Sequence, residues 1–208
     1  MADAELIRLY EEGIEQSKVD KIVEILRNGG LVIYPTDTVY GLGCDMKNKK
    51  ALERLAKIKG VKLDKADFSF ICRDLSNLSD HVAQIETKTF KILKRSLPGP
   101  YTFILPGSNT LPAAFKKKKT VGIRIPDNQI ILNIVEKLGN PLANTSIRDE
   151  DVILEYTTDP SLIHEKWKHL VDIVIDGGYG GNEASTVVDL SDGGEPVLIR
   201  EGKGSVVL

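Results

Sequence analysis

The chain opens with two predicted helices separated by a short strand. Apolar residues recur every three or four positions within residues 17–28, as on the buried face of a helix, and Ser17 is the predicted N-cap. Two glycines follow, and they favour the left-handed backbone that ends a helix. Residues 31–34 are almost all apolar, which is typical of a strand covered on both faces. Asn48 is the predicted cap of the second helix, and Gly60 ends it.

Further apolar runs predict a sheet with helices packed on it. The predicted strands are residues 68–72, 101–105, 120–125, 171–175, 186–190 and 197–200. The predicted helices are residues 86–95, 129–138 and 161–168. Strands and helices alternate over much of the chain, and no repeat or linker interrupts them. The pattern therefore predicts a single α/β domain, residues 1–208, with a large twisted mixed sheet.

Length and composition limit the class of protein. A chain of 208 residues is long enough to bury a core. Its longest apolar runs are far shorter than the roughly eighteen residues that span a bilayer. The acidic start lacks the basic segment and apolar core of a signal peptide. Cys44 and Cys72 stand at no metal-ligand spacing and are expected to be reduced core residues. We expect a cytoplasmic protein with no membrane partner and no metal site.

Charge is unevenly distributed along the chain, although the net charge is only −2. Residues 88–124 hold nine Lys and Arg residues and no acid, whereas residues 149–195 hold twelve acids and two bases. Such an asymmetry makes one face attractive to phosphate. We therefore expect the basic stretch to contribute to RNA binding, with a solvated loop as the alternative for its four consecutive lysines. The candidate contacts are Lys94, Arg95, Lys116, Lys117, Lys118 and Lys119.

Residues 35–43, with the sequence PTDTVYGLG, form the segment richest in candidate chemistry. They directly follow a predicted buried strand, and ligands bind at the carboxyl ends of strands in open α/β sheets. The segment offers two hydroxyls, a carboxylate, a phenol and two glycines, Gly41 and Gly43, which let backbone approach a ligand closely. Spacing alone is equally consistent with a Thr/Asp turn in which the glycines serve only the backbone geometry of the turn.

Other polar groups lie near predicted strand ends. The segments 144–146 and 185–186 present hydroxyls there, and Arg124 and Arg200 each lie at the end of an apolar run. Each arginine is either a clamp for phosphate or carboxylate or half of a structural ion pair. No G-x-x-x-x-G-K-[ST] occurs, which excludes a P-loop, and no G-x-G-x-x-G follows a strand. The three histidines lie far from these segments, so neither nucleophilic catalysis nor a zinc site is expected.

Five segments taken together resemble one known family. Residues 29–43 are similar to the signature of the YrdC-like threonylcarbamoyl-AMP synthases. PGPYT at 98–102, GIRIP at 122–126, STVVD at 185–189 and LIREG at 198–202 follow in that family's order. The resemblance implies a YrdC-like α/β fold with a deep, basic concave surface. It also implies an enzyme that joins L-threonine, bicarbonate and ATP into threonylcarbamoyl-AMP, releases pyrophosphate, and serves the modification of an adenosine in certain tRNAs.

The resemblance further implies roles for individual residues. Those that match the threonine-binding positions are Thr36, Arg124, Asn144 and Ser185. Those that match the nucleotide-binding positions are Lys59, Thr120, Ser146 and Arg200. ATP is expected as a substrate, with magnesium, and not as a tightly bound cofactor. Because a carbamate oxygen must attack the α-phosphorus of ATP, fixed positive charge is expected to be the main catalytic device, supplied by Lys59 and Arg148.

Two motifs depart from the synthases and resemble the YciO branch of the family. K-x-R at the end of the second helix is Lys59-Gly60-Val61 here, and S-x-N is Ser146-Ile147-Arg148. We expect Arg148 to replace the lost charge, with pairing to the acids at 149–151 as the alternative. The chain is identified as a YciO-like member of this family. It is either a synthase-type nucleotidyltransferase or a non-catalytic or differently catalytic protein that binds double-stranded RNA or tRNA.

Overall fold

The computed structural model describes residues 3–76, 78–115, 118–147, 155–193 and 195–205. The strands are β1 (Glu5–Arg8), β2 (Val32–Tyr34), β3 (Gly41–Asp45), β4 (Ser69–Ile71), β5 (Tyr101–Pro106), β6 (Thr120–Arg124), β7 (Leu142–Ser146), β8 (Ile173–Asp176), β9 (Thr186–Asp189) and β10 (Val197–Arg200). The helices are α1 (Gln16–Arg27), α2 (Lys49–Ile58), α3 (Thr87–Ser96), α4 (Gln129–Leu138), α5 (Glu155–Thr158) and α6 (Pro160–Trp167), with 3-10 turns η1 (Leu63–Lys65) and η2 (Leu78–Asp80).

In the described part of the chain, ten strands form one sheet in the order β1-β8-β2-β3-β7-β4-β6-β5-β9-β10. The pairs β1–β8, β2–β8, β4–β6 and β5–β9 are parallel. The other neighbouring pairs are antiparallel. The prediction of a single α/β domain built on a large mixed sheet is therefore confirmed.

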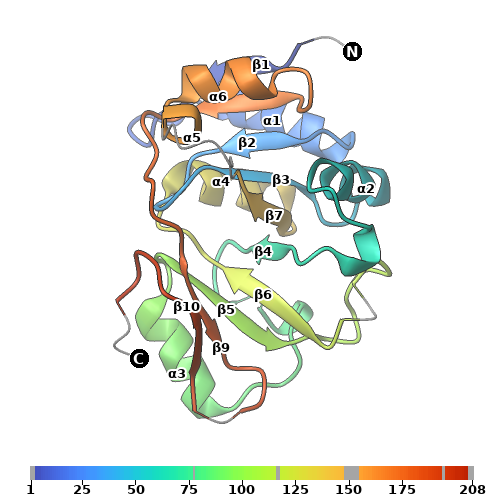
Figure 1. Ribbon diagram of the computed structural model, residues 1–208, viewed down its shortest axis with the longest axis vertical. Helices are drawn as coiled ribbons and strands as arrows, with labels where there is room; N and C mark the ends of the chain where they lie inside the picture. Colours follow the sequence, from blue (N-terminus) through green and yellow to red (C-terminus); the bar gives the residue numbers. More distant parts are fainter. Residues whose placement is uncertain (1–2, 77, 116–117, 148–154, 194, 206–208) are drawn as a thin grey trace.

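Helices cover the two faces of the sheet unequally. On one face α1 and α4 pack together, and Ile22 and Ile131 belong to the same core cluster as Ile173 of β8. On the other face Leu52 of α2, Leu93 of α3 and residues of β5 share a second cluster. In Figure 1, α1 and α4 lie toward the β1 end of the sheet, whereas α3 lies beside β5 and β9 at the other end. Between these ends, polar side chains occupy part of one sheet face.

The predicted helices and strands are all present, with small shifts at their ends. Helix α4 has the predicted bounds, the Asn48 side chain caps α2 by accepting a backbone N–H, and Gly29 has a φ of +90° after α1. The prediction of Ser17 as an N-cap is wrong. Helix α1 begins at Gln16, and Glu15 occupies the cap position without a side-chain cap bond. Backbone bonds to the Glu15 carbonyl start this helix, so a capping hydroxyl is not what fixes its first residue.

Three strands, β1, β3 and β7, were not predicted. β3 and β7 contain Gly41, Gly43 and Asn144, residue types that are disfavoured in strands. They are strands because each is paired on both sides within the sheet, which satisfies their backbone groups. Consequently residues 144–146 form the carboxyl end of β7 itself, and residues 35–43 run into β3.

Candidate functional site

A row of residues crosses one face of the sheet, over strands β7, β4, β6 and β5. Residues directly opposite one another in neighbouring strands point to the same face. Ser69 of β4 lies opposite Asn144 of β7 on one side and Gly122 of β6 on the other. Gly122 in turn lies opposite Ile104 of β5, and Arg124, two residues beyond Gly122, shares its face. Strand register therefore brings these residues to one surface.

A cavity of about 500 Å³ lies over this row. The predicted site residues that line it are Lys59, Thr120, Arg124, Asn144, Ser146, Ser185 and Arg200. Lys118 also lines it, whereas Asp67 is the one acidic side chain among the described lining residues. Such an excess of positive charge in a concave surface suits a ligand that carries several negative charges. This is the basic concave surface that the sequence predicted.

Arg124 is held by the loop that follows β2. Its Nη2 donates hydrogen bonds to Thr36 Oγ1 at 3.0 Å, Asp37 Oδ1 at 2.6 Å and Thr38 Oγ1 at 2.5 Å. Arg124 and Asp37 form an ion pair whose side chains are only 6% and 10% exposed. The ion-pair alternative for Arg124 is thus present in the structure, and Arg124 also lines the cavity. Thr36, predicted to contact threonine, binds Arg124 and is not among the lining residues.

Contacts among β10, β5 and the residue that precedes β9 build another part of the cavity wall. Arg200, at the end of β10, donates from Nη2 to the Ser185 carbonyl oxygen at 2.7 Å. Ser185 Oγ lies 2.9 Å from Thr102 Oγ1 in β5. Thr102 also lines the cavity, although it was not among the predicted site residues. These contacts place a guanidinium beside two hydroxyls, which is a suitable arrangement for binding an anion.

Two lysines lie on the α2 side of the cavity. Lys59 is the C-cap of α2 and lines the cavity. Lys118 Nζ lies 2.6 Å from Asp67 Oδ1, and its side chain is 18% exposed. Lys118, predicted as an RNA contact, therefore faces the same cavity as Lys59. Val61 is exposed and does not line the cavity. Arg148, the predicted replacement for the charge missing at Val61, lies outside the described residues.

Gly41 and Gly43 make room for a buried tyrosine. A Cβ atom on Gly41 would lie 2.8 Å from the ring of Tyr34, and one on Gly43 would lie 2.9 Å from the Tyr34 hydroxyl. Tyr34 is fully buried, and its hydroxyl donates a hydrogen bond to Asn144 Oδ1 at 2.6 Å. The glycines therefore lie in β3 and accommodate Tyr34, a role different from the turn geometry that spacing left open, and Gly41 also lines the cavity. Neither Tyr34 nor Ser69 was a predicted site residue.

Comparison with known proteins settles the family. A model of the Sua5/YciO/YrdC family, described as telomere recombination, matches residues 24–202. The chain belongs to the Sua5/YciO/YrdC family. The "Uncharacterized protein YciO" of Escherichia coli (strain K12) is 39% identical over 201 residues, which cover 95% of each chain. The threonylcarbamoyl-AMP synthase of Pyrococcus abyssi is 32% identical over 197 residues, which cover 92% of this chain and 56% of the synthase.

Solved structures of Sua5/YciO/YrdC proteins share the fold. The crystal structure of Escherichia coli YciO has a TM-score of 0.88 and 37% identity, with 98% of both chains covered. The crystal structure of Pyrococcus abyssi Sua5 complexed with L-threonine has a TM-score of 0.82 and 30% identity. That match covers 96% of this chain and 58% of the Sua5 chain. The predicted family and its YciO-like branch are therefore confirmed by sequence and by fold.

The predicted RNA contacts of this Sua5/YciO/YrdC chain separate in space. Lys94 and Arg95 lie in the last turn of α3 and line a hollow of their own. Lys118 instead lines the cavity over the sheet. Lys116 and Lys117 lie outside the described residues. The acid-free stretch of sequence thus supplies two different basic surfaces, and RNA binding by either stays a prediction.

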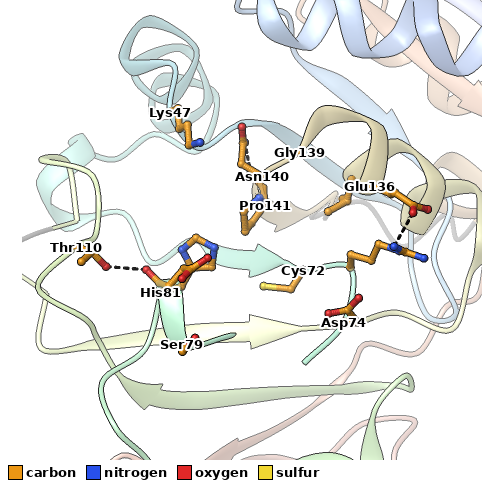
Figure 2. Close-up of a pocket in the computed structure, with 13 residues that line it drawn as sticks. Lys47, Cys72, Asp74, Ser79, His81, Thr110, Glu136, Gly139, Asn140 and Pro141 are labelled. Carbon is orange, nitrogen blue, oxygen red and sulfur yellow. Dashed lines mark hydrogen bonds and ion pairs between the residues drawn. The ribbon is translucent and has the colours of Figure 1, made fainter. Parts of the chain in front are cut away.

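A further cavity, of about 480 Å³, lies at the opposite ends of β3, β4 and β7. In Figure 2, Lys47 and Asn140 lie on one wall and His81 on the other. At its rim Arg73 forms an ion pair with Glu136 at 2.6 Å. Burial lowers the pKa of His81, which favours its neutral form. None of the predicted site residues lines this cavity, so it is separate from the candidate site.

Three further features of the described residues concern the cysteines, metal ligands and membrane-spanning helices. Cys44 and Cys72 are buried, as predicted, and burial raises the pKa of Cys72 to about 12. Within the described residues, no group of three or more His, Cys, Asp and Glu side chains is placed to hold a metal ion. Among the described helices, none has the length and apolar character needed to cross a membrane.

Proposed function

We propose that the chain is a threonylcarbamoyl-AMP synthase-type nucleotidyltransferase. The observation that carries this proposal is the basic cavity over the sheet, in which Lys59, Lys118, Arg124 and Arg200 surround hydroxyl and amide groups of several strands. The substrates that must meet there, a threonine carbamate and ATP, are both anions. The similarity to a threonylcarbamoyl-AMP synthase, at 32% identity over 92% of this chain, supports the proposal.

The proposed reaction has two balanced steps. First, the amine nitrogen of L-threonine forms a bond to the carbon of bicarbonate, and water is released, which leaves N-carboxythreonine. Second, an oxygen of the new carboxylate attacks the α-phosphorus of ATP, and pyrophosphate leaves with the electrons of the broken bond. Because two anions approach each other in the second step, fixed cations lower its barrier more than any acid or base would. The product would serve tRNA modification.

Two groups of residues in the cavity suit the two substrates. Arg124 and Asn144, with Ser185 of the same cavity, suit the carboxylate and polar groups of threonine. The hydroxyls of Thr120 and Ser146, together with the lysines and Arg200, suit the phosphates of ATP. Magnesium would arrive as the counter-ion of ATP, since divalent cations commonly accompany nucleotide phosphates.

The proposal is tested by incubating the protein with ATP, L-threonine and bicarbonate and measuring threonylcarbamoyl-AMP by mass spectrometry. Lys59→Ala should lower the yield about tenfold or more, because it removes a cation that faces the phosphates. Lys57→Ala, two residues earlier in α2 and outside the cavity lining, is the matched control and should retain wild-type activity. Absence of the product from the wild-type reaction would rule out the synthase.

A second candidate function is binding of tRNA or double-stranded RNA without synthesis. The hollow along α3 favours it, because Lys91, Lys94 and Arg95 line that hollow together. Phosphate contacts release counter-ions, so affinity for duplex RNA should fall steeply as salt rises. Charge reversal of Lys94 and Arg95 should weaken this binding and leave nucleotide binding intact. RNA affinity that does not depend on salt would count against this candidate.

A further inference from the structure

Tyr34 reaches from β2 across the whole width of β3. It lies opposite Gly41 in the β2–β3 pair, while Asn144 lies opposite Gly43 in the β3–β7 pair. Because both glycines lack side chains, the phenol ring lies over β3 and its hydroxyl bonds to Asn144 Oδ1 at 2.6 Å. Asn144 Nδ2 then donates to Ser69 Oγ of β4 at 3.0 Å. A chain of hydrogen bonds thus runs from a buried tyrosine to the cavity wall.

Tyr34 determines which way this chain of hydrogen bonds runs. Its hydroxyl is completely buried, and within the described residues its hydrogen-bond partner is Asn144. If the Asn144 amide were reversed, the phenol proton would be left buried without an acceptor, which is costly. Burial raises the pKa of Tyr34 far above its usual value, so the phenol keeps its proton. The amide oxygen is therefore turned toward Tyr34 and the amide nitrogen toward the cavity.

The corner formed by Asn144 and Ser69 consequently offers donors to a ligand. Ser69 Oγ accepts the bond from Asn144, so its own hydroxyl proton remains to be donated. Asn144 Nδ2 has a second hydrogen, and both residues line the cavity. We propose that Tyr34 is a positioning residue that fixes the Asn144 amide so that the Asn144–Ser69 corner binds an anionic oxygen of the ligand. This inference rests on the proposed function for its two candidate sources, the carboxylate of L-threonine and a phosphate of ATP.

Calorimetry on Tyr34→Phe tests the proposal. Without the phenol proton the Asn144 amide can reverse and present its oxygen to the anion, so affinity should fall about tenfold or more. Tyr101→Phe is the matched control, because it also removes a tyrosine hydroxyl that bonds a carbonyl but lies outside the cavity lining. A loss confined to L-threonine identifies the carboxylate as the bound group, and a loss confined to ATP identifies a phosphate. Unchanged affinity for both ligands would overturn the proposal.

A double-mutant cycle separates positioning from packing. If Tyr34 acts through Asn144, the double variant of Tyr34→Phe and Asn144→Ala should bind no more weakly than Asn144→Ala alone. Additive losses would show that Tyr34 acts on packing and would overturn the proposal. Ser69→Ala removes one donor and no part of the core. It should weaken binding of the same ligand whose affinity falls in Tyr34→Phe. It keeps the proposal testable if the tyrosine variant folds poorly.

These measurements distinguish failure of the inference about Tyr34 from failure of the proposed function. A wild-type protein that binds L-threonine and ATP, together with an unaffected Tyr34→Phe, would leave the proposed function standing and overturn the inference. A wild-type protein that binds neither would refute the proposed function. The corner would then be titrated with inorganic phosphate and acetate, for which the same loss in Tyr34→Phe is expected. Failure of the wild-type protein to bind either of these anions would overturn the inference as well.

Discussion

The ion pair between Arg124 and Asp37 predicts a large effect of one substitution on stability. Both side chains are almost completely buried, at 6% and 10% exposure, and their closest atoms lie 2.6 Å apart. Asp37→Ala leaves the guanidinium buried without its counter-charge, which costs about 3–5 kcal/mol in comparable cases. The Thr36 and Thr38 hydroxyls still accept from Nη2, so the loss should lie near the lower limit, about 3 kcal/mol.

The assay is urea unfolding followed by circular dichroism. With a denaturant slope of about 2 kcal/mol per molar urea, a loss of about 3 kcal/mol lowers the midpoint by about 1.5 M. Asp67→Ala is the matched control. Asp67 also pairs with a cation of the cavity, Lys118, but its own side chain is 96% exposed. Its midpoint should change little, since exposed ion pairs contribute little.

A double variant tests the physical reason directly. In Asp37→Ala with Arg124→Met both charges are removed, and replacing a buried pair by apolar groups is often neutral. The double variant should therefore be more stable than Asp37→Ala alone. The reasoning would be refuted if Asp37→Ala unfolded at the same urea concentration as Asp67→Ala, or if removal of Arg124 made it still less stable.

Three further outcomes follow from the described structure. Gly41→Ala should cost about 1–3 kcal/mol, because its Cβ would lie 2.8 Å from the Tyr34 ring; an unchanged unfolding midpoint would contradict this packing. Burial lowers the pKa of His81 in the folded state. As the pH falls, the unfolded state therefore takes up this proton before the folded state does, and the free energy of unfolding should decrease below about pH 6.5. His81→Asn should reduce that fall, as measured by thermal unfolding across pH. Burial raises the pKa of Cys72 to about 12, so Cys44 and Cys72 should react with a thiol reagent at pH 8 only after unfolding.

Local patterns were sufficient for much of the fold. Helix α4 was predicted with its correct bounds because apolar residues recur there at helical spacing behind a capping asparagine. Strand β2 was predicted because its residues are apolar on both faces. β3 and β7 escaped prediction because glycines and polar residues carry no strand signal of their own. Pairing on both sides, which is a property of the sheet, makes these segments strands.

The sequence by itself determined the family, the mixed α/β class and seven of the residues that line the candidate site, because these depend on motifs and on short-range periodicity. Only the tertiary structure decided that Arg124 pairs with Asp37, that Lys118 faces the cavity, and that the Tyr34 hydroxyl bonds to Asn144. Each of these contacts joins residues far apart in the chain. Such contacts depend on strand order and register, which bring distant residues to one sheet face and which no local pattern specifies.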